Sequence, residues 1–287
     1  MEERCDGTAD CQDGLDEEKC KAFFTFAGYN KMLVPVTNDN GATLGLNISI
    51  IIDDILQIDE NDGYFKSKYT IVRSWYNTHL TFKDLKRNPA KNLLSQEDMN
   101  SMWKPWMTLE NIESFDENKK TDKADKITII ANSEFIFKRG DRSHLHNTML
   151  FKGSENTINH QRQLSTNWIC YNDMRWYPFD TQRCTMQMVL YEETITLIPL
   201  SVNYTGKKEL SKNTVIGVYI CSMSIEKGSG VIVEIILGRP LFGTILTVFL
   251  PTSLLLILSQ MVKVFSTDHV DMVIEVNLTL LLVLTTM

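Results

Sequence analysis

The sequence lacks the features that mark a nucleic-acid-binding protein or a familiar enzyme. Its formal net charge is −7, and its lysines and arginines form no basic stripe, so binding to a phosphate backbone is not expected. It has no Gly-x-Ser-x-Gly elbow, no His-Glu-x-x-His metal pair and no glycine-rich nucleotide motif. His144 and His146 stand two apart, and exposed loop histidines are the simpler interpretation. We therefore expect neither an enzyme nor a nucleic-acid partner.

The chain shows no secretory leader, and its long apolar runs are confined to the last fifty residues. Between Arg239 and Lys263 the sequence PLFGTILTVFLPTSLLLILSQMV carries no charge, and about 20 apolar residues suffice to cross a bilayer. Pro251 would break a soluble helix but is tolerated in a membrane helix. The pattern predicts a first membrane helix at about 240–262 and a second at 273–287, within a transmembrane region 240–287. We expect the chain to be a fragment at both ends, since the second run is too short to span.

The first twenty residues are rich in cysteine and acids. The stretch RCDGTADCQDGLDEEKC is too short to build an apolar core, so cross-links and a cation are expected to hold it, or else it is a solvated acidic tail. It resembles the second half of an LDL-receptor class A module. The resemblance implies a partial module at 1–20, with structural calcium as its cofactor and a Cys5–Cys20 disulfide that leaves Cys11 without its upstream partner. The implied calcium ligands are Asp6, Asp10, Asp16 and Glu17.

The largest segment, residues 29–239, follows a linker at 21–28 and has the pattern of a β protein. Runs rich in Ile, Val, Thr and aromatics are separated by turn signals such as NDNG and KRGD. Side chains alternate clearly along 69–74, as in half-buried strands. Many short strands with one plausible short helix, NLLSQEDMNSM, predict a mainly β, antiparallel, immunoglobulin-like sandwich followed by α-helical membrane segments.

Four motifs in this segment resemble those of one receptor family. WYPFD lies between Cys170 and Cys184, in CYNDMRWYPFDTQRC. Upstream stand WYNTHL, beginning at Trp75, and WKP, beginning at Trp103; downstream, GRP opens the first membrane helix. In order and spacing this set is similar to the Cys-loop, or pentameric, ligand-gated ion channels, in an invertebrate glycine/GABA-receptor-like branch. The resemblance covers about 260 residues.

The resemblance implies an extracellular ligand-binding sandwich, four membrane helices and assembly with four further subunits into a homo- or heteropentamer. The protein would be a multi-pass plasma-membrane channel with an extracellular N-terminal part and a small-molecule agonist. A Cys170–Cys184 disulfide would close the loop, and Asp180 is expected to pair with Arg239, unless both are simply solvated. The implied gating and coupling residues are Tyr177, Pro178, Phe179, Asp180 and Arg239.

Agonist-binding residues are implied by position. Tyr191, seven residues past Cys184, falls where the family carries an aromatic, whereas Trp106 either contacts ligand or belongs to the core. The sequence departs from glycine and GABA receptors in its capping hairpin EKGSG and its facing strand, so an amine, another cation or a proton is an open alternative agonist. The candidate ligand-binding residues are Tyr191, Glu192, Trp106, Thr70, Val72 and Glu226.

The pore residues implied by the resemblance are Glu275, Asn277 and Leu284, with Leu284 as the gate. Acids at a pore mouth favour cations, whereas the following VNLTLLLVLTTM resembles the glycine/GABA branch, so the ion is left open. Asn47 and Asn203 begin glycosylation motifs. Cys221 lies in a strand pattern and is expected to be a buried free thiol. The alternative function is a single-pass adhesion receptor without a pore, which the second apolar run disfavours.

Overall fold

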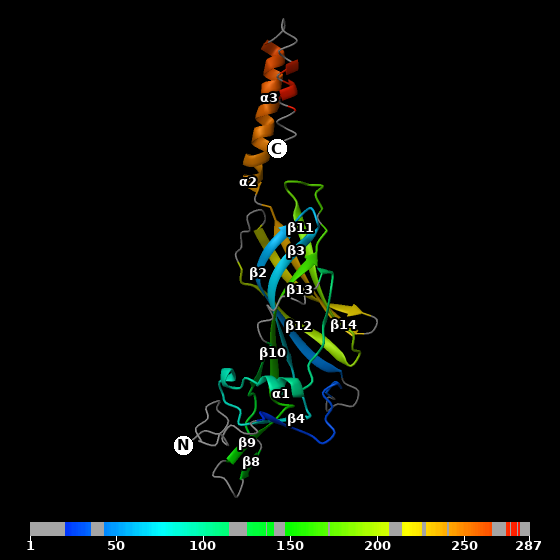
Figure 1. Cartoon of the computed structure of the whole chain (residues 1–287), viewed down its shortest axis with the longest axis vertical. Helices are drawn as coiled ribbons and strands as arrows, with labels where there is room; N and C mark the ends of the chain where they lie inside the picture. The colour runs from blue at the N-terminus through cyan, green and yellow to red at the C-terminus, as the bar shows by residue number, and fades with distance from the viewer. Residues whose placement is uncertain are drawn as a thin grey trace. The chain divides into compact units, whose positions relative to one another are not determined.

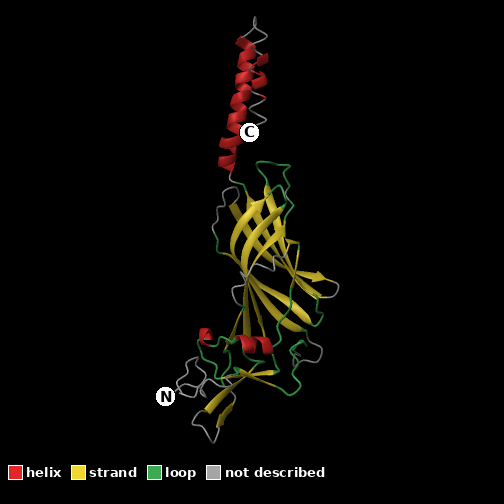
Figure 2. Ribbon diagram, in the orientation of Figure 1, coloured by secondary structure: helices red, strands yellow, loops and turns green. Residues whose placement is uncertain are grey.

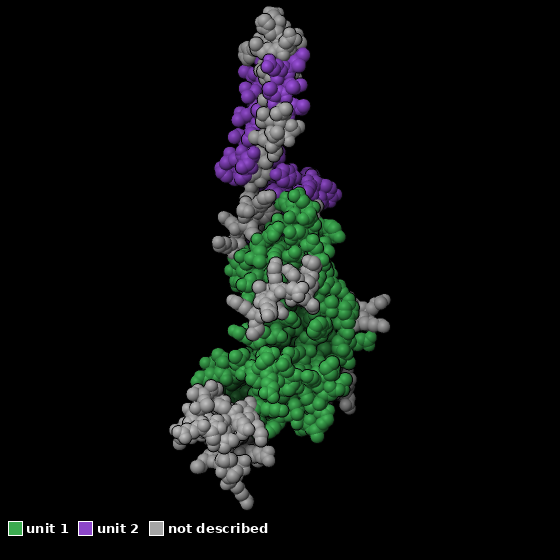
Figure 3. Space-filling model, viewed as in Figure 1, with its two compact units in different colours: residues 1–171, 184–207, 218–235 green, residues 172–183, 208–217, 236–287 purple. Residues whose placement is uncertain are grey.

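Strands dominate the described chain (Figure 2). The computed structural model describes residues 21–35, 43–114, 125–135, 137–140, 147–171, 173–206, 214–225, 228–239, 241–265, 274–275, 277–279 and 281. The residues predicted to form the calcium module, 1–20, lie outside this set. The chain divides into two compact units (Figure 3). Unit 1 is residues 1–171, 184–207 and 218–235, and unit 2 is residues 172–183, 208–217 and 236–287.

Fourteen strands are found in the described residues (Figure 1). They are β1 Phe23–Thr25, β2 Leu44–Asp59, β3 Tyr64–Trp75, β4 Leu80–Lys83, β5 Thr108–Glu110, β6 Ile112–Ser114, β7 Lys126–Ile130, β8 Phe137–Gly140, β9 Asn147–Lys152, β10 Thr157–Ile169, β11 Thr181–Leu190, β12 Ile195–Tyr204, β13 Thr214–Ile225 and β14 Gly228–Gly238. The helices are η1 Pro89–Lys91, α1 Gln96–Ser101, α2 Leu241–Thr244, the π-helical η2 Ile245–Phe249, and α3 Leu250–Phe265.

The strands form three sheets. The largest has the order β12-β2-β3-β10-β6, with β7 also on β10; the others are β13-β14-β11-β5 and β1-β4-β9-β8. The predicted antiparallel arrangement does not hold for β12, which runs parallel to β2, with Ile195 opposite Leu44. The chain enters β12 from β11, which belongs to another sheet. A crossover rather than a hairpin therefore sets the direction of β12.

Alternating side chains build the core of unit 1. In β2 every second residue from Leu44 to Ile52 is buried, and in β3 every second residue from Phe65 to Trp75. Trp75 packs edge-on against Trp103 at 5.8 Å between ring centroids. Because side chains on a strand point to opposite faces in turn, this period of two places the large apolar residues on one side. The sandwich prediction is confirmed at the level of a mainly β domain.

Two local expectations differ from the structure. Residues 23–25, expected to belong to a linker, form β1, because Phe23 is buried and packs edge-on against Phe82 of β4. Cys221, expected to be buried, is an exposed free thiol. It lies in β13, at the end of its sheet, and β13 leaves Ile216 and Tyr219 more than half exposed as well. An edge strand has only one neighbour to cover it, which accounts for the error at Cys221.

Unit 2 contains the apolar helix. Leu241–Met261 has 21 residues and a mean hydropathy of 2.2, and it is the one helix of the described chain long and apolar enough to cross a membrane. The π-helical η2 immediately precedes the helical turn that holds Pro251. The Thr252 hydroxyl donates to the carbonyl of Phe249 and the Ser253 hydroxyl to that of Leu250. Hydroxyl donors of this kind satisfy backbone carbonyls near a helix-breaking proline.

Candidate functional site

Tyr191, the leading candidate for agonist contact, stands beyond the end of β11 and is 61% exposed. Its hydroxyl donates a short hydrogen bond to Oε1 of Glu110, the last residue of β5. This bond, followed by burial and the negative charge of the carboxylate, raises the pKa of Tyr191 above 10.0. Tyr191 thus presents an accessible aromatic ring next to a carboxylate, a pair of groups suited to a positively charged ligand.

Asn111 holds Glu110 in place. It adopts φ of 60°, in the left-handed region that Asn tolerates better than most residues, and so separates β5 from β6. Its amide Nδ2 donates to the carbonyl oxygen of Thr185 at 2.8 Å. The β5–β11 ladder then pairs Gln187 with Glu110. Sequence reasoning missed Glu110 and Asn111, although the Asn after a short β run was a turn signal.

Trp106 and the capping hairpin lie near the same end of this ladder. Trp106 precedes β5 by two residues and is 83% exposed, so the alternative that it is a core residue is wrong. The hairpin approaches the backbone on either side of Tyr191 at Gly228, where an added Cβ would lie 2.1 Å from the carbonyl oxygen of Leu190 and 3.2 Å from the amide nitrogen of Glu192. Only glycine allows so close an approach between the two backbones.

The remaining ligand candidates are more scattered. Glu192 is exposed and accepts a 3.0 Å hydrogen bond from the Thr194 hydroxyl. Thr70 and Val72 lie on β3, in a different sheet from Tyr191, and Thr70 donates to Asp53 at 3.2 Å. Glu226 lies outside the described residues.

A second group of predicted residues forms one cluster within unit 2. Asp180 Oδ1 accepts from Arg239 Nε at 3.1 Å, and its Oδ2 accepts from Arg239 Nη2 at 3.1 Å. The side chains are 3% and 7% exposed respectively, so this is a two-pronged ion pair shielded from water. The alternative of a solvated Asp and a helix-flanking Arg is wrong. A planar guanidinium matches a carboxylate in this geometry, which fixes direction as well as charge.

Gln182 is a second hydrogen-bond donor to Asp180. Its amide Nε2 donates to Asp180 Oδ2 and to the carbonyl oxygen of Asp173, and its Oε1 accepts from the Asp173 backbone at 2.8 Å. Burial raises the pKa of Asp180, but the hydrogen bonds from Arg239 and Gln182 outweigh it, and the net pKa is lowered. Asp180 therefore carries a full charge at neutral pH.

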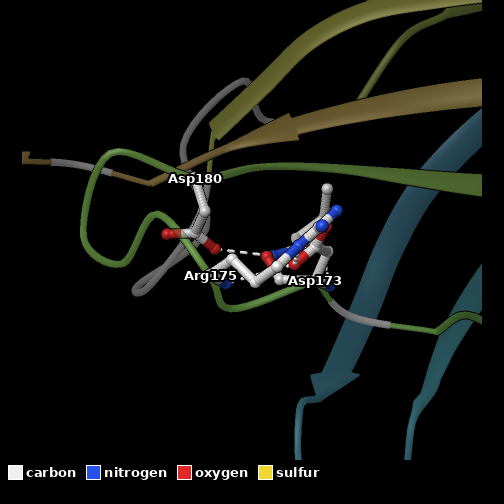
Figure 4. Close-up of polar contacts among 4 residues, drawn as sticks. Asp173, Arg175 and Asp180 are labelled. Atoms are coloured by element: carbon white, nitrogen blue, oxygen red, sulfur yellow. Dashed lines mark hydrogen bonds and ion pairs between the residues drawn. The ribbon is translucent and has the colours of Figure 1, made fainter.

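An exposed ion pair lies in the same loop. Arg175 donates through Nε and Nη2 to the Asp173 carboxylate (Figure 4). These hydrogen bonds lower the pKa of Asp173 to about 2. Both side chains are more than half exposed, so the pair is screened by water, and its contribution to stability is small.

The apolar tip of the loop contacts the apolar helical segment that begins at Leu241. The Tyr177 ring stacks on the Phe249 ring at 6.4 Å between centroids, and the Arg239 guanidinium lies 4.9 Å from the Tyr177 ring. The Tyr177–Pro178 peptide bond is cis. Phe179 is 68% exposed. The Cys170–Cys184 disulfide predicted to close the loop is present, with 5.0 Å between the two Cα atoms.

The candidate pore residues are described only in part. Glu275 and Asn277 are helical, and Asn277 accepts a short hydrogen bond from the Ser259 hydroxyl of α3. This bond joins Asn277 to α3. Leu284 and the predicted calcium ligands lie outside the described residues, as do Cys5 and Cys20. Asn203 is exposed on β12, whereas Asn47 is half-buried on β2.

Comparison with known proteins agrees with this arrangement. Residues 21–223 match the neurotransmitter-gated ion-channel ligand binding domain. The chain is 24% identical over 173 residues to "Gamma-aminobutyric acid receptor subunit beta-4" of Gallus gallus. That alignment covers 58% of this chain and 29% of the relative, so the chain spans less than a third of the relative's length. Since the family match covers more than half of the sequence, the chain belongs to the neurotransmitter-gated ion-channel ligand-binding domain family.

Proposed function

We propose that this chain is part of a subunit of a neurotransmitter-type ligand-gated ion channel of the glycine/GABA-like branch. In this proposal agonist binds between the extracellular sandwiches of a homo- or heteropentamer in the plasma membrane, and the second membrane helix lines the pore. The family match and the apolar helix after β14 support the proposal. The coupling of binding to opening is assigned to the disulfide loop.

The observation that carries this proposal is the shielded pair of Asp180 and Arg239. Arg239 joins the end of β14 to the helix that begins at Leu241, so any displacement of β14 acts on it directly. Asp180 holds Arg239 through two hydrogen bonds, and Tyr177 lies between Arg239 and the Phe249 ring. A movement of the strand would thus be passed to the disulfide loop and the helix together.

Charge reversal tests this coupling in the full-length subunit. Asp180→Arg or Arg239→Asp alone leaves two like charges in a shielded site, which costs about 3–5 kcal/mol and should abolish agonist-evoked current. The double variant should restore part of the current. Arg175→Glu, which reverses an exposed charge in the same loop, is the matched control and should stay near native. Surface biotinylation separates failed gating from failed delivery, and a double variant with surface protein but no current would contradict the coupling.

The chemistry at Tyr191 favours a small agonist with an ammonium group. An exposed ring attracts a cation by about 0.5–2 kcal/mol, and the carboxylates of Glu110 and Glu192 add charge of the right sign. Trp106 offers a second exposed ring near the same end of the ladder. These side chains agree with either an amine or a zwitterionic amino acid.

Substitutions at Tyr191 test the site, with 4-aminobutyrate, tyramine and acid steps as the probes. Tyr191→Ala should raise the half-maximal concentration of the active probe about 2- to 30-fold, the equivalent of the lost cation–π energy. Tyr191→Phe keeps the ring but loses the hydrogen bond to Glu110, and it should raise the half-maximal concentration less than Tyr191→Ala does. Tyr76→Ala, at an exposed tyrosine after β3, is the control. An unchanged dose–response in Tyr191→Ala would remove this residue from the site.

The permeant ion follows from a separate measurement. Glu275 and the nearby Asp271 would favour cations at the pore mouth, while the branch assignment would favour anions. A reversal potential that moves with external sodium supports the electrostatic argument, and one that moves with chloride supports the branch assignment.

A further inference from the structure

Exposed aromatic side chains crowd the tip of the disulfide loop. We define the loop tip as residues 174–179, all within unit 2. Trp176 is 76% exposed and Phe179 68%, and Met174 and Tyr177 are each about two-fifths exposed. Single exposed apolar residues are ordinary, but a run of four in six residues, two of them large and mostly bare, marks a surface that meets an apolar partner.

The position of the loop tip on the membrane helix identifies that partner. Tyr177 stacks on Phe249, which lies eight residues after Leu241, the first residue of the apolar span. Eight residues correspond to about 12 Å along a helix axis. The contact is shallower than that, because helical side chains tilt back toward the N-terminus. Leu241 begins the apolar span and therefore lies at the edge of the acyl chains, so the loop tip lies at the boundary with the headgroups or just inside it.

The residue types at the loop tip suit this boundary. Trp and Tyr are enriched where a membrane meets water, because each combines an apolar ring with a polar edge. The charges beside the loop tip are already neutralised, since Arg239 is paired with Asp180 and Arg175 with Asp173. A loop without net charge enters the boundary without leaving an ion unpaired.

We propose that the loop tip is an interfacial lipid anchor, in which Trp176 and Phe179 insert between the headgroups of the leaflet where the Leu241–Met261 helix begins. The anchor fixes the depth of the loop relative to the helix and covers the outer side of the Asp180–Arg239 pair. It requires only that this helix cross a bilayer, and it is independent of agonist, ion and gating. A further protein segment over the loop tip is the competing occupant.

Lipid-borne quenchers test the proposal on the full-length subunit in phosphatidylcholine vesicles. The chain has five tryptophans, of which Trp176 and Trp106 are highly exposed. Phosphatidylcholine brominated at acyl carbons 6 and 7 should quench tryptophan emission in the native protein and in Trp106→Phe, the matched control. The quenched fraction should fall by more than half in Trp176→Phe. Carbons 11 and 12 should quench less than carbons 6 and 7, because the boundary is shallow.

Any one of three results would overturn the anchor. Equal lipid quenching in Trp176→Phe and the native protein would show that Trp176 is away from lipid. Loss of Trp176 emission with aqueous iodide but not with brominated lipid would place it in water, and protection from both would place it under protein. If Trp176→Phe is not delivered or lacks its disulfide, Phe179→Trp supplies the signal instead and should gain quenching over the native protein. These readouts do not depend on channel current, so they separate failure of the anchor from failure of the proposed gating.

Discussion

Arg73 is a charged residue on a core position of β3. It is 5% exposed, and its Nη1 donates to the carbonyl oxygen of Pro105 at 2.8 Å. Burial lowers its pKa to about 10, so the guanidinium stays charged at neutral pH. Its Nη2 lies 2.9 Å from Nδ1 of His160, the residue opposite it on β10. Because a guanidinium can only donate, Nδ1 must accept, and the imidazole is the neutral form with its proton on Nε2.

This arrangement predicts acid sensitivity of the sandwich. Burial lowers the pKa of His160 below 6.5, opposed by the Asp125 hydrogen bond and reinforced by the charges of Arg73 and Lys104. Asp125 lies 3.5 Å from Nε2 of His160 and also pairs with Arg162 at 3.6 Å. An unfolded chain takes up a proton near pH 6.5, whereas the folded one does not. Stability should therefore fall as the pH drops from 6.5 to the lower folded pKa, and level off beneath it.

Denaturation of the full-length protein in detergent at several pH values measures this effect. His160→Gln, whose side chain accepts from Arg73 and donates to Asp125, should flatten the slope in that window. The lowered pKa of Asp125 adds a separate loss of stability below pH 3.8, which gives an internal reference. Equal slopes for the native protein and His160→Gln between pH 6.5 and 5 would refute the assignment.

At the scale of elements, Asn111 ties β5 to β11. Asn111→Ala loses the hydrogen bond to Thr185 and places a Cβ in left-handed backbone, so it should destabilise the sandwich by about 2 kcal/mol. Asn111→Gly loses only the hydrogen bond and should cost about 1 kcal/mol. Urea denaturation of the two variants checks the order. If Asn111→Gly were as unstable as Asn111→Ala, the backbone conformation would not be the cause.

The disulfide closes a loop with a sequence separation of 14 residues. Replacing Cys170 and Cys184 together by Ala should lower stability by about 3 kcal/mol on the chain-entropy argument. The midpoint of denaturant unfolding, compared with that of the native protein with and without reductant, measures the loss. Replacement of the exposed Cys221 by Ala is the control and should leave the midpoint unchanged. A double variant as stable as the native protein would mean that the loop is fixed by other contacts.

Element types were predictable wherever a short repeat in the sequence decided them. The alternation in 69–74 predicted β3, because burial selects apolar residues at a fixed period, and an uncharged run predicted the long apolar helix Leu241–Met261. What the sequence could not give were partners set by three-dimensional position. The parallel direction of β12 depends on a crossover, and the bond between Glu110 and Tyr191 joins residues 81 apart in sequence.

The partners of the buried charged residues were also beyond prediction from the sequence pattern alone. Asp180 and Arg239 were paired on the family resemblance. The structure adds Gln182 of β11 as the third member, two residues after Asp180. The alternation along β3 places Arg73 on the buried face with Ile71 and Trp75, but no pattern in the sequence identifies the partners of its charge. Its partners come from the loop after Trp103 and from β10, so its burial is a property of the fold.

At the scale of the whole molecule, glycosylation tests which side of the membrane holds the sandwich. Asn203 is exposed on β12, which is an edge strand of its sheet among the described strands. A glycan on Asn203 therefore has no neighbouring strand on that side. Asn47 is half-buried on β2, flanked by β12 and β3. If residues 29–239 are extracellular, translation with microsomes should add one glycan that Asn203→Gln removes and Asn47→Gln leaves. When protease is added outside the microsomes, the sandwich should be protected, and the protected product should carry this glycan. A sandwich that is digested from outside and gains no glycan would reverse the topology, and with it the placement of the agonist site.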